Sequence, residues 1–227
     1  MVRPEQQYQK IKEVGAVVGF ILKTLKNEIR PGICGKDLEK MAQQLMKEKR
    51  VKSSTLGYKG FPSYICISLN EELTHGIPDE RIFRAGDLVS LDVACYKKDI
   101  RGAIHHADAA LTTIVPGEKK QNYEKKQNLL NVTKGALQEA IAQIKPGVVI
   151  TTQDIGAIIE NYVHAQGYYV IKEYGGHGIG YLMHQEPFIP NYKIPKEISV
   201  EILPDTAICI EPLVQIGDAK IKLSTNR

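Results

Sequence analysis

Apolar residues recur at three- and four-residue steps in two segments of the chain, and a Pro-Gly pair follows each segment. In residues 11–25 the apolar positions are Ile11, Val14, Val18, Ile21, Leu22 and Leu25. In residues 129–144 they are Leu129, Val132, Leu137, Ile141 and Ile144. This spacing predicts two helices, each with one buried face. Because proline lacks an amide donor and glycine readily adopts left-handed turns, we expect each helix to end at its Pro-Gly pair.

The surroundings of the two Pro-Gly pairs repeat each other. Residues 29–33 read Ile-Arg-Pro-Gly-Ile, and residues 144–148 read Ile-Lys-Pro-Gly-Val. After each pair an aspartate, Asp37 or Asp154, precedes a further helical pattern, which suits the N-terminus of a helix. We therefore predict a single domain over residues 1–227 with two repeated halves, about 8–115 and 116–227. A chance similarity between two helix ends is the alternative.

Short apolar runs in the second part of each half predict strands. They cover residues 65–69 and 88–92 in the first half and 207–211 in the second, and the last two runs end in the carboxylates Asp92 and Glu211. We expect an α/β (α+β) fold of two pseudo-symmetric helix-helix-strand halves. A pseudo-twofold axis would bring the two sheets together and place one carboxylate from each half near their joint.

Composition and charge exclude several classes of protein. A hydrophobic fraction of 43% and a charged fraction of 25% are typical of globular domains rather than disordered or membrane proteins. The net charge of +4 comes from dispersed lysines, and the run around 119–126 fits a solvated loop better than a nucleic-acid surface. The N-terminus lacks an apolar signal core, and the four cysteines form no C-x-x-C pair. We expect a cytoplasmic protein with reduced thiols.

Three carboxylates and one imidazole stand in apolar or glycine-rich surroundings. Asp92, Asp108 and Glu211 each lie in an apolar run, and His177 is surrounded by glycines. Buried carboxylates are costly unless a cation compensates them, and this donor set suits Mn, Fe, Co or Zn. Carboxylate oxygens can bridge two ions, which would raise the acidity of a water molecule shared by the ions and favour hydrolysis as the reaction. Taken singly, each carboxylate could be an exposed strand end and the histidine a structural one.

Six short motifs containing the candidate residues follow one another along the chain. They are His75-Gly-Ile-Pro, Ser90-Leu-Asp-Val, Asp108-Ala-Ala-Leu, Gly176-His-Gly-Ile-Gly, His184-Gln-Glu-Pro and Ile210-Glu-Pro. Their order resembles that of type I methionine aminopeptidases. The resemblance runs from about Tyr8 to the end of the chain, and its most specific part is the string from His177 to Pro187.

The resemblance implies a pita-bread fold, a curved antiparallel sheet with helices outside, and a metal-dependent enzyme that removes the initiator methionine. It makes His75 and His184 catalytic groups that contact the scissile amide. It also implies one or two divalent ions, Co, Mn, Fe or Zn, held by Asp92, Asp108, His177 and Glu211. The methionine pocket would be lined by Tyr58, Phe61, Cys66 and Met183, whose apolar, aromatic and sulfur character suits a thioether.

The implied substrates are nascent polypeptides with a small residue after the N-terminal methionine. We expect a monomer with the ribosome as a candidate partner, and neither a membrane nor a specific nucleic acid. Two alternatives stay open. One is a proline-specific aminopeptidase of the same fold, and the other is a binding module of this fold that has lost catalysis.

Two features depart from the pattern of the family. Asp92 and Asp108 are further apart than the corresponding family carboxylates, with the extra residues between Lys97 and His106. A longer hairpin tip would absorb them, and His105 and His106 become alternative ligands. No acidic residue follows Asp218. A last bridging glutamate is thus missing, and we expect a C-terminally truncated chain: a fragment, a truncated gene product or an inactive paralogue.

Overall fold

Two helix pairs and a set of strands make up the chain in a computed structural model that describes residues 4–218 and 220–223. The helices are α1 (Pro4–Glu28), α2 (Gly35–Glu48), α3 (Lys120–Gln143) and α4 (Thr152–Ala165), with short 3-10 turns η1 (Tyr58–Gly60) and η2 (Lys196–Ile198). The strands are β1 (Lys52–Ser53), β2 (Cys66–Leu69), β3 (Leu88–Lys98), β4 (Ile104–Ile114), β5 (Tyr169–Val170), β6 (Gly176–Gly178), β7 (Gln185–Ile189) and β8 (Val214–Gln215).

The fold divides into two units. The first consists of Met1–Gln127, His177–Phe188 and Leu203–Cys209. The second consists of Asn128–Gly176, Ile189–Ile202 and Ile210–Arg227. The predicted repeat of halves at about 8–115 and 116–227 stays a prediction.

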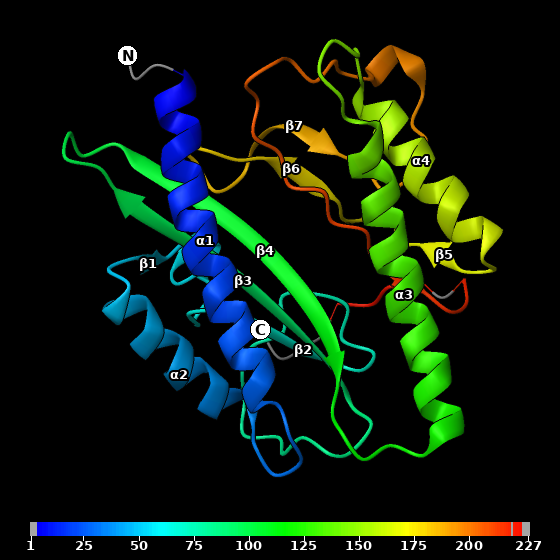
Figure 1. The fold of residues 1–227 in the computed structure, drawn as a ribbon. Helices are drawn as coiled ribbons and strands as arrows, with labels where there is room; N and C mark the ends of the chain where they lie inside the picture. Colours follow the sequence, from blue (N-terminus) through cyan, green and yellow to red (C-terminus); the bar gives the residue numbers. More distant parts are fainter. Residues whose placement is uncertain (1–3, 219, 224–227) are drawn as a thin grey trace. The chain divides into compact units, whose positions relative to one another are not determined.

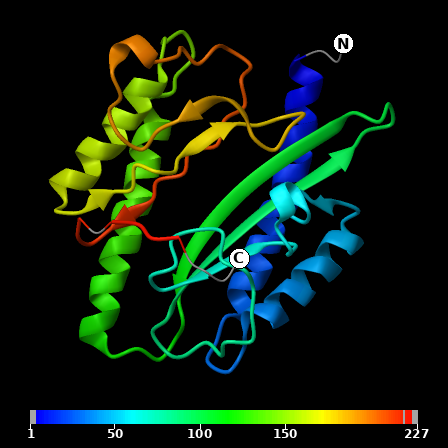
Figure 2. The same ribbon diagram turned by 180° about the vertical axis from the view of Figure 1, so that it is seen from behind.

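The first unit is built on an antiparallel sheet with β3 at its centre. β4 pairs with β3 along its whole length, from Leu88 opposite Ile114 to Lys98 opposite Ile104. The short strands β1 and β2 pair with β3 as well. Helix α1 lies across β3 and β4 (Figure 1), and Figure 2 shows the same strands from behind. The long β3–β4 hairpin is the element that carries two of the predicted metal ligands.

The predicted buried face of α1 is confirmed. Five of the six predicted apolar residues are at most 5% exposed and belong to one cluster with the sheet, whereas Ile11 is only partly buried. The five are Val14, Val18, Ile21, Leu22 and Leu25. Each such side chain stabilises the fold by roughly 1.5–3 kcal/mol through burial. The hydrophobic periodicity therefore located the surface that holds α1 on the sheet.

The predicted helix ends are also confirmed. Helix α1 ends at Glu28 and α3 at Gln143, just before the two Pro-Gly pairs. Gly32 has φ +94° and Gly147 has φ +77°, the left-handed region that a side chain disfavours. Local backbone chemistry is sufficient to end both helices.

The two aspartates after the Pro-Gly pairs cap the next helices. Asp37 Oδ2 accepts a hydrogen bond from the Cys34 amide at 3.2 Å, and Asp154 Oδ2 accepts one from the Thr151 amide at 2.8 Å. Each aspartate is the third residue of its helix. Both therefore satisfy an amide that the helix itself leaves without a partner.

The predicted buried face of α3 is partly wrong. Val132 is buried, but Ile141 and Ile144 are 52% and 40% exposed. The buried positions are Val132, Ala136 and Ala140, which recur at four-residue steps. Ile141 follows Ala140 by one residue and is turned about 100° away from that face.

The strand predicted at residues 207–211 is reduced to a short ladder. An isolated bridge joins Ile208 to Gly178. On either side of it the Ile179 amide donates to the Ala207 carbonyl, and His177 and Cys209 exchange backbone hydrogen bonds. The ladder is short because its partner β6 has three residues. In the second unit, the next strand, β8, pairs with β5 instead.

Among the residues that the structure describes, no helix is long and apolar enough to cross a bilayer.

Candidate metal centre

The β3–β4 hairpin places Asp92 and Asp108 on the same face of the sheet. Asp92 is opposite Ala110, and Asp108 is opposite Ala94. Because side chains alternate along a strand, the two carboxylates are diagonal neighbours, about 7–8 Å apart at their Cα atoms. Cys66 on β2 is opposite Asp92. Burial raises the pKa of the Cys66 thiol, and the charges of both aspartates raise it further.

The extra residues between these aspartates lengthen the hairpin. The two strands run to Lys98 and from Ile104, and the turn between them is closed by a hydrogen bond from the Gly102 amide to the Asp99 carbonyl at 3.0 Å. Gly102 has φ +82°, which a turn of this kind requires. The register around Asp108 is therefore continuous despite the longer tip.

The structure places His105 and His106 away from the other candidate ligands. His105 is buried, with its Nε2 atom 3.3 Å from Asp99 Oδ2, and His106 Nδ1 is 2.8 Å from Ser54 Oγ. Burial, and then the neighbouring His105, lower the pKa of His106. In the described part of the chain neither histidine joins the candidate metal group, so the idea that they are alternative ligands is not supported.

His177 is held by the backbone next to it and by the segment of the chain that lies opposite. Its amide donates to the Cys209 carbonyl at 3.2 Å, and the Cys209 amide donates back at 2.7 Å. The Nδ1 atom is 2.9 Å from the Gly178 carbonyl oxygen. Since a carbonyl accepts, Nδ1 must carry the proton, and Nε2 keeps its lone pair for a ligand bond. That Nε2 atom is 3.8 Å from Asp108 Oδ2.

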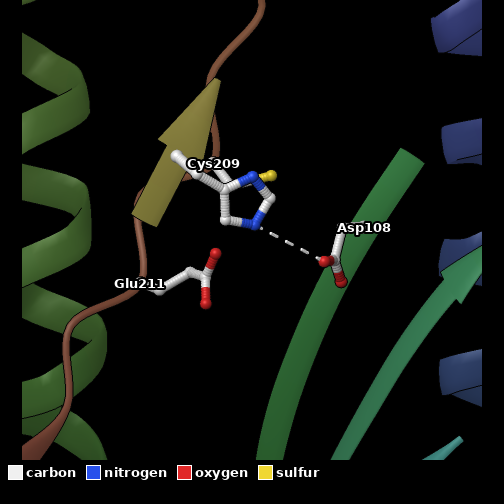
Figure 3. Close-up of side chains that lie close together, drawn as sticks. Asp108, Cys209 and Glu211 are labelled. Carbon is white, nitrogen blue, oxygen red and sulfur yellow. Dashed lines mark ion pairs between the residues drawn. The ribbon is translucent and has the colours of Figure 1, made fainter. Parts of the chain in front are cut away.

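Four side chains bring ligand atoms close together. Asp108, His177, Cys209 and Glu211 each offer one donor, and all four donors lie within 4.8 Å of one another; Figure 3 shows Asp108, Cys209 and Glu211. Ligand bonds to a divalent ion measure about 2.0–2.3 Å, so donors around one tetrahedral ion are about 3.3–3.8 Å apart. The spacing and the donor types fit a divalent metal ion.

Three of the four predicted ligands belong to this group, and Asp92 is not among them in the residues that the structure describes. Asp92 lies on β3 opposite Cys66 of β2, on the face of the sheet that Asp108 occupies. Its role as a ligand stays a prediction.

Cys209 is the member of the group that the sequence analysis missed. It precedes Glu211 by two residues, and residues two apart in an extended chain project to the same side. That spacing was a usable signal, because Glu211 was already a candidate ligand. The Cys209 thiol is partly exposed, unlike those of Cys34, Cys66 and Cys95.

His184 lies between two neighbours, His177 and Tyr58. The rings of His177 and His184 meet edge to face with their centroids 4.2 Å apart. His184 Nδ1 is 2.9 Å from the phenol oxygen of Tyr58. A predicted catalytic residue and a predicted pocket residue are therefore in contact next to a candidate ligand.

The other predicted site residues are Phe61, Met183 and His75. Phe61 closes the η1 turn by donating its amide to the Tyr58 carbonyl at 2.9 Å, and Met183, which precedes His184, is buried. His75 is exposed with φ +56°. The next residue, Gly76, packs so closely against β2 that an added Cβ would lie 2.2 Å from the Ile67 carbonyl oxygen. This contact fixes the loop of His75 against β2.

Comparison with known proteins decides the family. Residues 9–224 match the model of metallopeptidase family M24. The chain belongs to this family. A methionine aminopeptidase of Mycoplasma capricolum subsp. capricolum is 40% identical over 227 residues, which are all of this chain and 86% of that protein.

Solved structures of methionine aminopeptidases agree with this membership. The methionine aminopeptidase of Rickettsia prowazekii has a TM-score of 0.87 at 26% identity, covering 98% of this chain and 85% of that one. That of Thermotoga maritima has a TM-score of 0.84 at 35% identity, covering 96% and 83%. The chain has the pita-bread fold of these metallopeptidases, as the motifs predicted.

Proposed function

We propose that this M24 protein is a methionine aminopeptidase, which removes the initiator methionine from nascent chains by hydrolysis. The observation that carries this proposal is the convergence of Asp108, His177 and Glu211 within 4.8 Å, with His184 packed on the ring of His177. The full-length similarity to a methionine aminopeptidase supports the substrate class.

A divalent ion would be held by Asp108, His177 and Glu211, with Asp92 completing the site on β3. Bound there, Co, Mn, Fe or Zn would lower the pKa of a water molecule and supply hydroxide at neutral pH. His177 takes part through Nε2, because its Nδ1 proton is given to the Gly178 carbonyl. Asp108, whose Oδ2 atom is 3.8 Å from His177 Nε2, would balance the charge of the ion.

His184 and His75 are assigned to the scissile amide. If Tyr58 donates its hydroxyl proton to His184 Nδ1, the Nε2 atom of that ring carries N–H. An N–H donor stabilises the negative charge that develops on the amide oxygen. His75 projects from a loop that Gly76 holds on β2, which keeps its backbone in one conformation.

The methionine side chain of the substrate would bind among Tyr58, Phe61, Cys66 and Met183. Cys66 is buried opposite Asp92, a predicted ligand, and Met183, which precedes the predicted catalytic residue His184 in the chain, is also buried. A flexible thioether packs well against apolar and sulfur-containing side chains. We further propose that the enzyme acts as a monomer in the cytoplasm on chains with a small second residue, and that the ribosome is its partner.

The test is release of free methionine from a Met-Ala-Ser peptide by the purified chain after addition of Co²⁺ or Mn²⁺. We expect turnover that a chelator abolishes. A proline-specific enzyme would instead cleave an Ala-Pro-Ser peptide, and a binding module would cleave neither. Either of these last results, with metal bound and the chain folded, would overturn the proposal.

A further inference from the structure

Cys209 occupies a position that points its thiol into the candidate metal group. Its backbone and that of His177 exchange both hydrogen bonds, at 3.2 and 2.7 Å, so the two residues are a directly opposed antiparallel pair. Side chains of such a pair project from the same face of the ladder. The thiol is accordingly within 4.8 Å of the ligand atoms of His177 and Asp108, which belong to the same unit as Cys209.

The other cysteines have different surroundings. Cys34 Sγ is 3.2 Å from Asp37 Oδ2, where it helps to cap α2. Cys66 and Cys95 are buried, and burial raises the pKa of both thiols, that of Cys95 to about 12. Among the described residues, Cys209 is the cysteine that joins two possible oxygen ligands and an imidazole.

Sulfur changes which ion such a site prefers. Carboxylates and imidazole alone accept hard and borderline ions, including manganese, whereas a thiolate favours zinc and other thiophilic ions. We propose that Cys209 is a ligand of this metal centre and that its thiolate biases the centre toward zinc over manganese. This inference rests on the proposed metal centre. As the metal–sulfur bond forms, the S–H bond breaks and its proton passes to solvent.

The metal–sulfur bond has a direct spectroscopic readout. Cobalt replaces zinc in mixed sulfur and nitrogen sites, and a cobalt–thiolate bond absorbs in the near ultraviolet, whereas cobalt bound by oxygen and nitrogen does not. We expect the chain titrated with Co²⁺ to develop this absorption. X-ray absorption of the zinc form should show a sulfur neighbour at about 2.3 Å. Both measurements use the unmodified chain, so they do not depend on a variant that folds.

Two cysteine variants separate the ligand from its background. Cys209→Ser should lose the near-ultraviolet band and lower the ratio of zinc to manganese affinity by about tenfold or more. Cys34→Ser is the matched control, because serine preserves the cap of α2, and it should keep both properties.

The outcomes distinguish this inference from the proposed function. If cobalt binds and His177→Ala abolishes its binding, but the unmodified chain shows neither the band nor a sulfur neighbour, the metal centre stands and the role of Cys209 is wrong. Retention of the band in Cys209→Ser would also overturn that role. Failure of the unmodified chain to bind any of the three ions would overturn both the metal centre and its sulfur ligand.

Discussion

The Nδ1 atom of His184 is 2.9 Å from the phenol oxygen of Tyr58, a residue 126 positions earlier in the chain. The His184 ring also packs edge to face on His177, with centroids 4.2 Å apart. Tyr58 therefore orients His184 beside a candidate ligand of the metal. We propose that His184 acts on the substrate and His177 on the metal, and these two roles have different consequences when each ring is removed.

Replacing His184 with alanine should lower kcat by about 10² or more without loss of metal. The expected magnitude is that of removing a group that acts on the reacting amide in the transition state. Turnover of Met-Ala-Ser and metal content of the same preparation are the measurements. His164→Ala, on the exposed side of α4, is the control and should keep full turnover. Loss of metal in step with activity would make His184 a ligand instead.

The Tyr58→Phe variant should lower kcat less than His184→Ala does, by about tenfold, because the phenol orients the catalytic ring without touching the ion. Removing the hydroxyl leaves His184 Nδ1 without this partner and lets the ring choose the other tautomer. The bound metal should be unchanged. Tyr123→Phe, at an exposed tyrosine of α3, serves as the comparison. If Tyr58→Phe has no effect on kcat, the hydrogen bond does not position His184.

His177→Ala should abolish tight metal binding as well as activity. The variant removes the Nε2 donor whose tautomer the Gly178 carbonyl fixes, and Asp108 loses the partner that is 3.8 Å away. Calorimetric titration with Co²⁺ or Mn²⁺ measures the effect directly. A titration identical to that of the unmodified chain would show that the ion, if any, binds elsewhere.

Local patterns in the sequence predicted the parts of the fold that depend on local chemistry. The ends of α1 and α3 follow from Pro-Gly, and Asp37 and Asp154 cap the next helices as expected. The strand expected at 207–211 depends instead on a partner that is distant in the sequence. Its extent depends on the length of β6, which the apolar run from Ala207 to Ile210 does not encode.

The candidate site was predictable wherever a motif contained its residue. Asp108, His177 and Glu211 were found in that way, and the structure brings them together. Cys209 was missed because a thiol in an apolar strand usually packs as a small hydrophobic residue. Cys209 joins the candidate metal group because its backbone pairs with that of His177, which is a contact between residues distant in the sequence. The exposed Ile141 shows the same limit, since the face of α3 that is buried depends on packing rather than on apolar content.

The backbone at Gly76 should tolerate no side chain. In Gly76→Ala the new Cβ would be 2.2 Å from the Ile67 carbonyl oxygen and 2.8 Å from Ser68 Cα, both backbone atoms that cannot move alone. We expect destabilisation of about 1–3 kcal/mol and reduced turnover, because the loop of His75 must shift away from β2. Thermal and denaturant unfolding measure the first effect.

Gly19→Ala is the matched control for that substitution. Gly19 lies within α1, and no atom is within 4 Å of its added Cβ. Alanine has the better helix propensity, so this variant should be more stable by roughly 0.5–1 kcal/mol. If both alanines change stability alike, steric contact with β2 does not explain the requirement for glycine at position 76.

The ion pair between Glu118 and Lys126 should make part of the stability depend on pH. Lys126 donates to Glu118 Oε2 at 2.8 Å, and the Lys119 amide donates to Oε1 at 3.0 Å; these bonds hold the pKa of the Glu118 carboxyl below its ordinary value of 4.5. A carboxyl group whose pKa is lower in the folded chain than in the unfolded chain stabilises the fold at pH values above its unfolded pKa. This stabilisation is lost as the pH falls through its folded pKa. Glu118→Gln should therefore lower Tm at pH 7, and the difference should shrink as the pH falls through the folded pKa of Glu118, measured on the metal-free chain by calorimetry. Glu124→Gln removes a carboxylate from an exposed pair whose charged atoms are 3.9 Å apart, and it should change Tm little across the same pH range. A Tm difference for Glu118→Gln that persists unchanged in acid would show that the carboxylate charge is not its cause.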